Sequence, residues 1–234
     1  MINTNGKLYL VPTPIGNLGD ITKRALDTLE QVDIIACEDT RHSGRLLKEF
    51  NISKKLISYH DFNEAKRATK LLNELQSGLS IAIITDAGTP GISDPAYRIV
   101  RIAVENKIEI VPLPGANAIS PALTGSGLPT DKFYFDGFLP HKSNQRKKRF
   151  EAVKEIEATL IFYESPHRIL KSVQDALEVL GNRQGCIARE ISKLHEEFIR
   201  GSLEEIIKII TDRTIKGEIV LVIEGFNKKR TKSR

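Results

Sequence analysis

IAIITDAGTPGISDP, residues 81–95, joins a short apolar run to a loop of glycine, proline and small polar residues. The same order recurs in KLYLVPTPIGN, residues 7–17, and in IEIVPLPGANA, residues 108–118. Short β-branched runs bounded in this way predict buried parallel strands. In open α/β sheets ligands bind just outside the carboxyl ends of such strands, where glycine lets a ligand approach the backbone closely. The three loops therefore predict a pocket lined mostly by main chain and suited to a cofactor.

Strand and helix patterns alternate through the first half of the chain, which predicts right-handed crossovers and a mostly parallel sheet. The expected strands cover residues 7–11, 33–37, 55–59, 81–84 and 108–111. The expected helices cover residues 22–31, capped by Asp20, then 43–50, then 64–76, capped by Asn63, and finally 96–106.

Strands follow one another at shorter intervals in the second half, which predicts some antiparallel pairing. They are expected at residues 133–138, 159–163, 186–191, 196–200 and 218–224, with helices at 116–124, 144–156, 167–180 and 203–211. The predicted fold class is therefore α/β, with a mostly parallel N-terminal sheet and a mixed C-terminal sheet. We expect domains at residues 1–115 and 116–226, followed by a basic, disordered tail at 227–234.

Composition argues for a globular protein without a membrane span. The chain has 234 residues, 40% of them hydrophobic, and no apolar run approaches the roughly 20 residues that cross a bilayer. No secretory signal is visible at the N-terminus. The two cysteines lie far apart and no Cys/His spacing suggests zinc. We therefore expect no metal, inert buried thiols and a reduced, cytoplasmic location.

Positive charge is concentrated in two segments of a chain whose net charge is +5. One is residues 141–150 and the other is the tail after Phe226, and neither contains an acid. The positive charge of these two segments is larger than the net charge of the whole chain, so the remainder of the chain is net acidic. Such a distribution is typical of proteins that bind a polyanion, although basic tails and charged helix faces are often only solvated.

Two acidic residues follow predicted strands of the first half. Asp86 comes directly after a buried strand and can accept hydrogen bonds from a ligand ammonium group or from amides. Asp39 matches the acid that grips a ribose about 20 residues after a glycine loop, but it can equally cap the helix that begins near Arg41. The loop at 12–17 is not G-x-G-x-x-G, so we expect no pyrophosphate cradle.

Charged groups also follow two strands of the second half. YESPHR, residues 163–168, and REISK, residues 189–193, lie at strand ends, where exposed polar groups act more often than they pack. No Ser-His-Asp order, phosphate-binding loop or carboxylate pair stands out. The groups that could accept a proton during catalysis are Glu164, Asp39, His60, and Glu190 beside Arg189.

Eight blocks of unusual composition run in order from residue 12 to residue 225. They are PTPIGNLGDIT, ACEDTRHSGRLL, TDAGTPGISDPAY, PLPGANA, SGLPTDKFYFDGFLPHK, FYESPHR, REISKLHEEFIRG and GEIVLVIEG. With these blocks the chain resembles the ribosomal RNA small-subunit methyltransferase I family, within the tetrapyrrole methylase (class III S-adenosylmethionine methyltransferase) superfamily.

This resemblance implies a homodimer that uses S-adenosylmethionine to methylate the ribose 2′-oxygen of a cytidine in the decoding region of 16S ribosomal RNA. The partner would be the small ribosomal subunit. The implied cofactor contacts are Pro14, Asp86, Ala87, Gly88, Ile92, Asn117, Ala118, Tyr163 and Arg189. The phosphate contacts that we expect from charge are Arg41, Lys142, Arg146, Lys147, Lys148, Arg149, Arg168 and the tail.

Three alternative functions stay open at this point. A methylase acting on a tetrapyrrole carbon would have no use for the basic segments or for the EDTRHSGRLL block. A nicotinamide-dependent oxidoreductase would carry the glycine fingerprint that is missing here. A non-enzymatic RNA-binding or ribosome-assembly protein would fit the basic segments, but would leave the main-chain-lined loops without a purpose.

Overall fold

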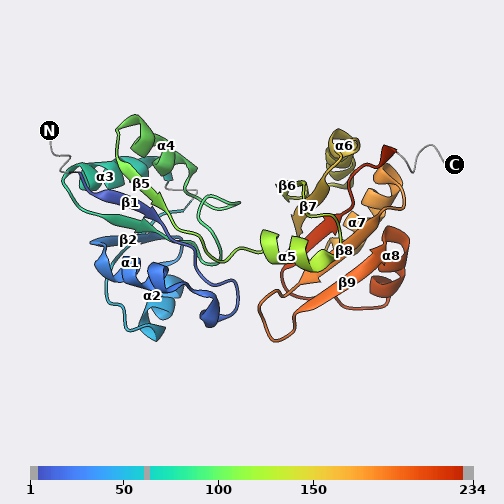
Figure 1. Cartoon of the computed structure of the whole chain (residues 1–234), viewed down its shortest axis with the longest axis horizontal. Coiled ribbons are helices and arrows are strands. Elements are labelled where there is room, and N and C mark those ends of the chain that lie inside the picture. The colour runs from blue at the N-terminus through green and yellow to red at the C-terminus, as the bar shows by residue number, and fades with distance from the viewer. Residues whose placement is uncertain (1–4, 61–63, 229–234) are drawn as a thin grey trace. The chain divides into compact units, whose positions relative to one another are not determined.

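The computed structural model describes residues 5–60 and 64–228 and falls into two units, Met1–Asn117 (unit 1) and Ala118–Arg234 (unit 2) (Figure 1). The expected cap Asn63 and most of the basic tail lie outside the described residues.

Unit 1 is built on a five-stranded sheet in the order β3-β2-β4-β1-β5, with every pairing parallel. β2 and β4 are buried along their whole length, as expected for strands covered on both faces. The prediction of a parallel sheet is confirmed. The strands are β1 (Lys7–Leu10), β2 (Ile34–Cys37), β3 (Lys55–Ser58), β4 (Ile81–Ile83) and β5 (Glu109–Pro112).

Helices cover both faces of this sheet. Residues of α1 and α2 share one apolar core with it, and residues of α3 and α4 share another. The helices are α1 (Lys23–Gln31), α2 (Thr40–Glu49), α3 (Glu64–Gln76) and α4 (Tyr97–Glu105). The predicted cap of α1 is wrong, because Asp20 ends a short 3-10 turn (Leu18–Asp20). The hydroxyl of Thr22 caps the helix instead, accepting from the Ala25 amide at 3.0 Å.

Unit 2 contains a mixed sheet in the order β6-β7-β10-β8-β9. β6 runs parallel to β7 and the other pairs are antiparallel, which confirms the mixed sheet that the sequence predicts. The strands are β6 (Phe133–Phe138), β7 (Thr159–Glu164), β8 (Gln184–Arg189), β9 (Glu197–Ser202) and β10 (Ile219–Ile223).

The helices of unit 2 are divided between the two faces of its sheet. α6, α7 and α8 bury their apolar side chains on one face, around Phe150, Val173 and Ile206. α5 packs against β8, β9 and β10. The helices are α5 (Ile119–Ser126), α6 (Ser143–Val153), α7 (Ile169–Leu180) and α8 (Leu203–Thr211).

Both cysteines are free and buried, Cys37 on β2 and Cys186 on β8. Burial raises the pKa of the Cys186 thiol to about 11, so its reactive thiolate form is scarce at neutral pH. Within the part of the chain that is described, no helix is both long enough and apolar enough to cross a membrane.

Candidate functional site

Three loops of unit 1 are tied together by main-chain and hydroxyl hydrogen bonds. The amide of Thr13 donates to the carbonyl of Gly88 at 2.9 Å, and the amide of Gly88 donates back at 3.0 Å. The hydroxyl of Thr89 donates to the carbonyl of Ala116 at 3.0 Å. Since β1 lies between β4 and β5 in the sheet, the loops that follow these strands meet at one edge.

Two glycines make this close approach possible. Gly88 has φ +91°, in the left-handed region where other residues are strained. At Gly115 an added Cβ would lie 2.7 Å from Cβ of Pro12, a rigid ring that cannot move aside. A larger residue at either position would force the loops apart, so the sequence preserves a surface of bare backbone here.

An acid and an imidazole stand at the same edge of unit 1. The carboxylate of Asp86, 43% exposed, accepts from the amide of Asp39 at 3.4 Å, and its Oδ1 lies 3.5 Å from Nδ1 of His42. The His42 side chain is 54% exposed. Sequence reasoning missed His42, although it lies in the first turn of the helix that follows β2, the strand beside β4.

The structure brings most of the predicted cofactor residues of unit 1 to these loops. Asp86, Ala87 and Gly88 share one loop with Ile92, whose side chain is 39% exposed, and Asn117 ends the loop after β5. Pro14 is buried, so its side chain is not open to a ligand. Three predicted cofactor residues, Ala118, Tyr163 and Arg189, belong to unit 2.

Asp39 acts as the N-cap of α2. Its Oδ1 accepts from the Arg41 amide at 2.8 Å, and its Oδ2 accepts from Nη2 of the same arginine at 2.9 Å. The hydrogen bonds from the Arg41 side chain and backbone lower the pKa of Asp39 to about 2. A carboxylate with so low a pKa is a poor general base, so the structure favours the capping role of Asp39 over a catalytic one.

Glu164 is fully buried at the end of β7. Its Oε1 accepts from the Ser165 amide at 2.6 Å and from Nε of Arg168 at 2.8 Å, while its Oε2 accepts from the Ser172 hydroxyl at 2.5 Å. Both oxygens are thus engaged and closed to solvent. This position is incompatible with the predicted role as a base, and it makes Arg168 part of an internal ion pair.

Arg189 braces loops of unit 2. Its guanidinium donates to the carbonyls of Lys216 and His195 and to Glu197, and the side chain is 15% exposed. With its donors used in this way, a cofactor contact by the Arg189 side chain is not supported. Tyr163 is half-buried and packs edge-on against Phe135 and Phe138, with ring centroids 4.9 and 5.2 Å apart.

His60, the third predicted base, is half-buried two residues after the end of β3, and the residues that follow it in sequence are outside the described part. Its role stays a prediction.

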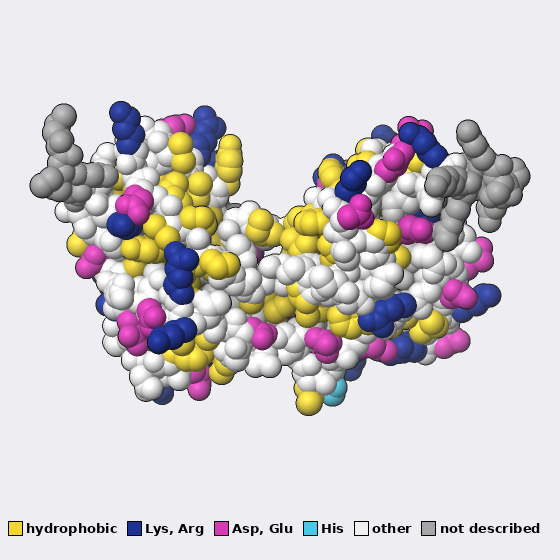
Figure 2. Space-filling model, viewed as in Figure 1, with side chains coloured by type: hydrophobic (Ala, Val, Ile, Leu, Met, Phe, Trp, Pro, Cys, Tyr) yellow, Lys and Arg dark blue, Asp and Glu magenta, His cyan; other side chains and the backbone are white. Residues whose placement is uncertain are grey.

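The basic segment of unit 2 carries less free charge than its composition suggests. Arg146 is 2% exposed and paired with Asp175, so it cannot contact RNA and the prediction for it is wrong. Lys147 pairs with Glu178 at 2.6 Å, and Arg149 pairs with Asp136 at 2.7 Å. Figure 2 shows the resulting mixture of basic and acidic side chains on unit 2.

Four of the seven predicted phosphate contacts outside the tail are exposed, namely Arg41, Lys142, Lys148 and Arg149. Lys142 and Lys148 are exposed and form no ion pair with any residue that the structure describes. Arg41, in unit 1, is 85% exposed although it is paired with Asp39.

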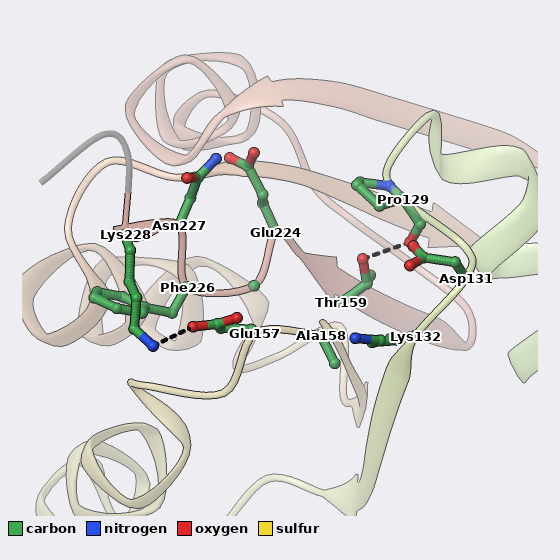
Figure 3. Close-up of a pocket in the computed structure, with 11 residues that line it drawn as sticks. Pro129, Asp131, Lys132, Glu157, Ala158, Thr159, Glu224, Phe226, Asn227 and Lys228 are labelled. Carbon is green, nitrogen blue, oxygen red and sulfur yellow. Dashed lines mark hydrogen bonds and ion pairs between the residues drawn. The ribbon is translucent and has the colours of Figure 1, made fainter.

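A pocket of about 390 Å³ opens at the opposite end of β7 in unit 2 (Figure 3). Glu157 and Lys228 form an ion pair of 2.8 Å across its wall, and the Thr159 hydroxyl donates to the carbonyl of Pro129 at 2.6 Å. Of the residues predicted to bind cofactor, to bind RNA or to act in catalysis, the lining contains only Asn227 and Lys228, the described start of the tail.

Comparison with known proteins gives consistent matches. Residues 7–207 match the family model described as Tetrapyrrole (Corrin/Porphyrin) Methylases. The chain is 53% identical to "Ribosomal RNA small subunit methyltransferase I" of Vibrio cholerae, over 94% of this chain and 77% of that protein. It is 50% identical to the protein of the same name from Halalkalibacterium halodurans, over 96% of this chain and 78% of the other.

The fold is similar to that of solved methyltransferases. The uroporphyrin-III C-methyl transferase of Thermus thermophilus, solved in complex with S-adenyl homocysteine, superposes with a TM-score of 0.64 at 15% identity. The match covers 93% of this chain and 97% of the other. At so low an identity this likeness concerns the fold alone.

Proposed function

The chain belongs to the tetrapyrrole methylase family and, within it, to the ribosomal RNA small subunit methyltransferases I, and from this membership we propose its reaction. It transfers a methyl group from S-adenosylmethionine to the ribose 2′-oxygen of a cytidine in the decoding region of 16S ribosomal RNA. These matches confirm the family that the sequence blocks indicate.

The observation that supports this reaction most directly is the three-loop edge of unit 1. Bare backbone, an exposed carboxylate at Asp86 and an exposed apolar side chain at Ile92 lie together there. These groups suit a ligand that combines hydroxyls, an ammonium group and a flat apolar ring. The residues present therefore fit S-adenosylmethionine, which when bound supplies an activated methyl group of its own.

The task left to the chain is to bind, to orient and to remove a proton. Alignment of the reacting atoms can lower the barrier by roughly 7–11 kcal/mol, and the rigid ties between Thr13 and Gly88 and between Thr89 and Ala116 support such alignment. For the proton of the 2′-hydroxyl we propose His42 as acceptor. With Asp86 facing Nδ1, the ring keeps its proton on that atom and leaves Nε2 as the base.

An RNA substrate requires groups on the protein that contact phosphates. Lys142, Lys148 and Arg41 are exposed cations able to contact RNA phosphates. We propose in addition that the protein works as a homodimer in the cytoplasm, where small ribosomal subunits are found.

A methyl-transfer assay tests the reaction. Small subunits from cells lacking this activity are incubated with the protein and labelled S-adenosylmethionine, and primer extension maps the ribose methylation. We expect label at one cytidine of 16S RNA and none in a porphyrinoid. Label in the porphyrinoid alone would overturn the RNA substrate in favour of tetrapyrrole methylation.

Replacing Asp86 with alanine is expected to weaken S-adenosylmethionine binding by about 10- to 150-fold, the loss of roughly 1.5–3 kcal/mol for hydrogen bonds to a charged group. Calorimetry measures the affinity. Asp94→Asn is the matched control, since it removes a charge from the same loop, at a residue outside the proposed contacts. Unchanged affinity in Asp86→Ala would remove Asp86 from the site.

A further inference from the structure

We propose that His141 is an RNA contact, donating from Nε2 to a phosphate oxygen, and that Arg168 and Glu164 are the residues that position its ring. The inference rests on the proposed function, because it assigns a role in binding the same RNA. It also gives a new role to Arg168, which on charge alone is expected to contact phosphate itself.

His141 lies in a segment fixed to the end of the unit 2 sheet. The segment is LPHKS, residues 139–143, between β6 and α6. Because β6 and β7 are parallel, it lies at the same sheet edge as the segment that follows β7. The amide of Leu139 donates to the carbonyl of Tyr163 at 3.2 Å, which joins the two.

A chain of charged groups leads from the buried interior to the imidazole. Glu164 is fully buried and holds the guanidinium of Arg168 through Nε at 2.8 Å and through Nη2 at 2.5 Å. The Nη1 of Arg168 reaches Nδ1 of His141. Since a guanidinium can only donate, Nδ1 accepts, and the ring carries its proton on Nε2.

A second arginine, the buried Arg146, holds the backbone of the same segment. Nη1 of Arg146 donates to the carbonyls of Pro140 and His141 at 3.1 and 3.2 Å. Asp175 holds this arginine at 2.8 Å from Nε and also accepts from the hydroxyl of Ser143 at 2.8 Å. The segment is therefore fixed through the side chain of His141 and through the main chain of residues 139–141.

These contacts present an exposed imidazole in a defined orientation. His141 and Lys142 are both exposed, and the segment contains no acid. A ring held in this way offers an outward N–H donor next to a free ammonium group, which is the combination that recognises a phosphate oxygen. Packing alone does not account for this arrangement, because an exposed imidazole ring does not need a partly buried ion pair to fix its orientation.

RNA binding measured against salt concentration separates His141 from its neighbour. The probe is a 16S RNA fragment of the decoding region, and the variants are His141→Ala and Lys142→Gln. We expect His141→Ala to weaken binding about tenfold at every salt concentration, with the slope unchanged, because a neutral donor releases no counterion. Lys142→Gln is expected to flatten the slope by about 0.7–0.9. Unchanged affinity in His141→Ala, or an equal loss of slope, overturns the inference.

A double-mutant cycle tests the positioning role of Arg168. We expect Arg168→Met to weaken RNA binding as much as His141→Ala, and the two changes together to add nothing. Additive losses overturn the role of Arg168. Because Arg168→Met leaves Glu164 buried without its cation, Glu164→Gln is combined with it if the single variant does not fold.

Long-range ¹H–¹⁵N spectra of the wild-type protein provide a second readout. They should show His141 with an unprotonated Nδ1 and a protonated Nε2, whereas the opposite tautomer overturns the proposed donor. If the wild-type protein neither binds nor methylates small-subunit RNA, the proposed function itself fails. If it does both and His141→Ala binds equally well, only the present inference fails.

Discussion

Replacing His42 with alanine is expected to lower kcat by roughly 10²–10⁴-fold, the usual contribution of a positioned general base. The expectation follows from the geometry of His42 and from the environments of two predicted bases. Asp39 is held at a pKa of about 2 by Arg41, and Glu164 is sealed inside unit 2. His42 combines an exposed ring with a carboxylate that faces its Nδ1, at 3.5 Å.

Single-turnover methyl transfer measures this effect, with calorimetry to show that S-adenosylmethionine still binds. The helix should tolerate the change, because His42 is exposed in the first turn of α2 and alanine is a strong helix former. His60→Ala is the matched comparison, since it removes the imidazole of unit 1 that the sequence predicts as a base. A loss of less than threefold in His42→Ala, with a large loss in His60→Ala, would transfer the role to His60.

The meeting of the three loops at one edge of unit 1 could be predicted from the sequence because it depends on local patterns. Each apolar run ends at glycine or proline, and parallel strands bring their carboxyl ends to one edge. The tie between Thr13 and Gly88 is a consequence of that arrangement. The identity of the cofactor and of the reaction came from the resemblance to a family, because the loops alone do not determine them.

The roles of the charged residues could not be predicted in the same way. Burial and partner choice depend on tertiary packing, and the partners are distant in sequence, as Arg146 on α6 and Asp175 on α7 illustrate. In the sequence, a basic segment therefore looks like an RNA-binding face even where acidic residues from elsewhere in the chain pair with it in the fold. The same reason explains Arg189, whose strand-end position suggested a ligand but whose donors are used by neighbouring loops.

The Arg146–Asp175 pair should have the largest effect on stability. Asp175→Ala is expected to lower the free energy of unfolding by about 3–5 kcal/mol, because it leaves a guanidinium that is 2% exposed without its counter-charge. Urea unfolding followed by circular dichroism is the suitable measurement, since the chain has no tryptophan. A loss below about 1 kcal/mol would mean that water reaches Arg146 once the acid is gone.

The double variant Arg146→Met/Asp175→Leu separates stability from function. Apolar residues of similar size often replace a buried ion pair with little loss, so we expect this variant to regain at least half of the stability that Asp175→Ala loses. RNA binding should nevertheless stay weak, because methionine cannot donate to the carbonyls of Pro140 and His141. The segment that carries His141 would then lose its main-chain anchor although unit 2 stays folded. Wild-type RNA affinity in the stable double variant would show that this anchor is not needed to present the segment.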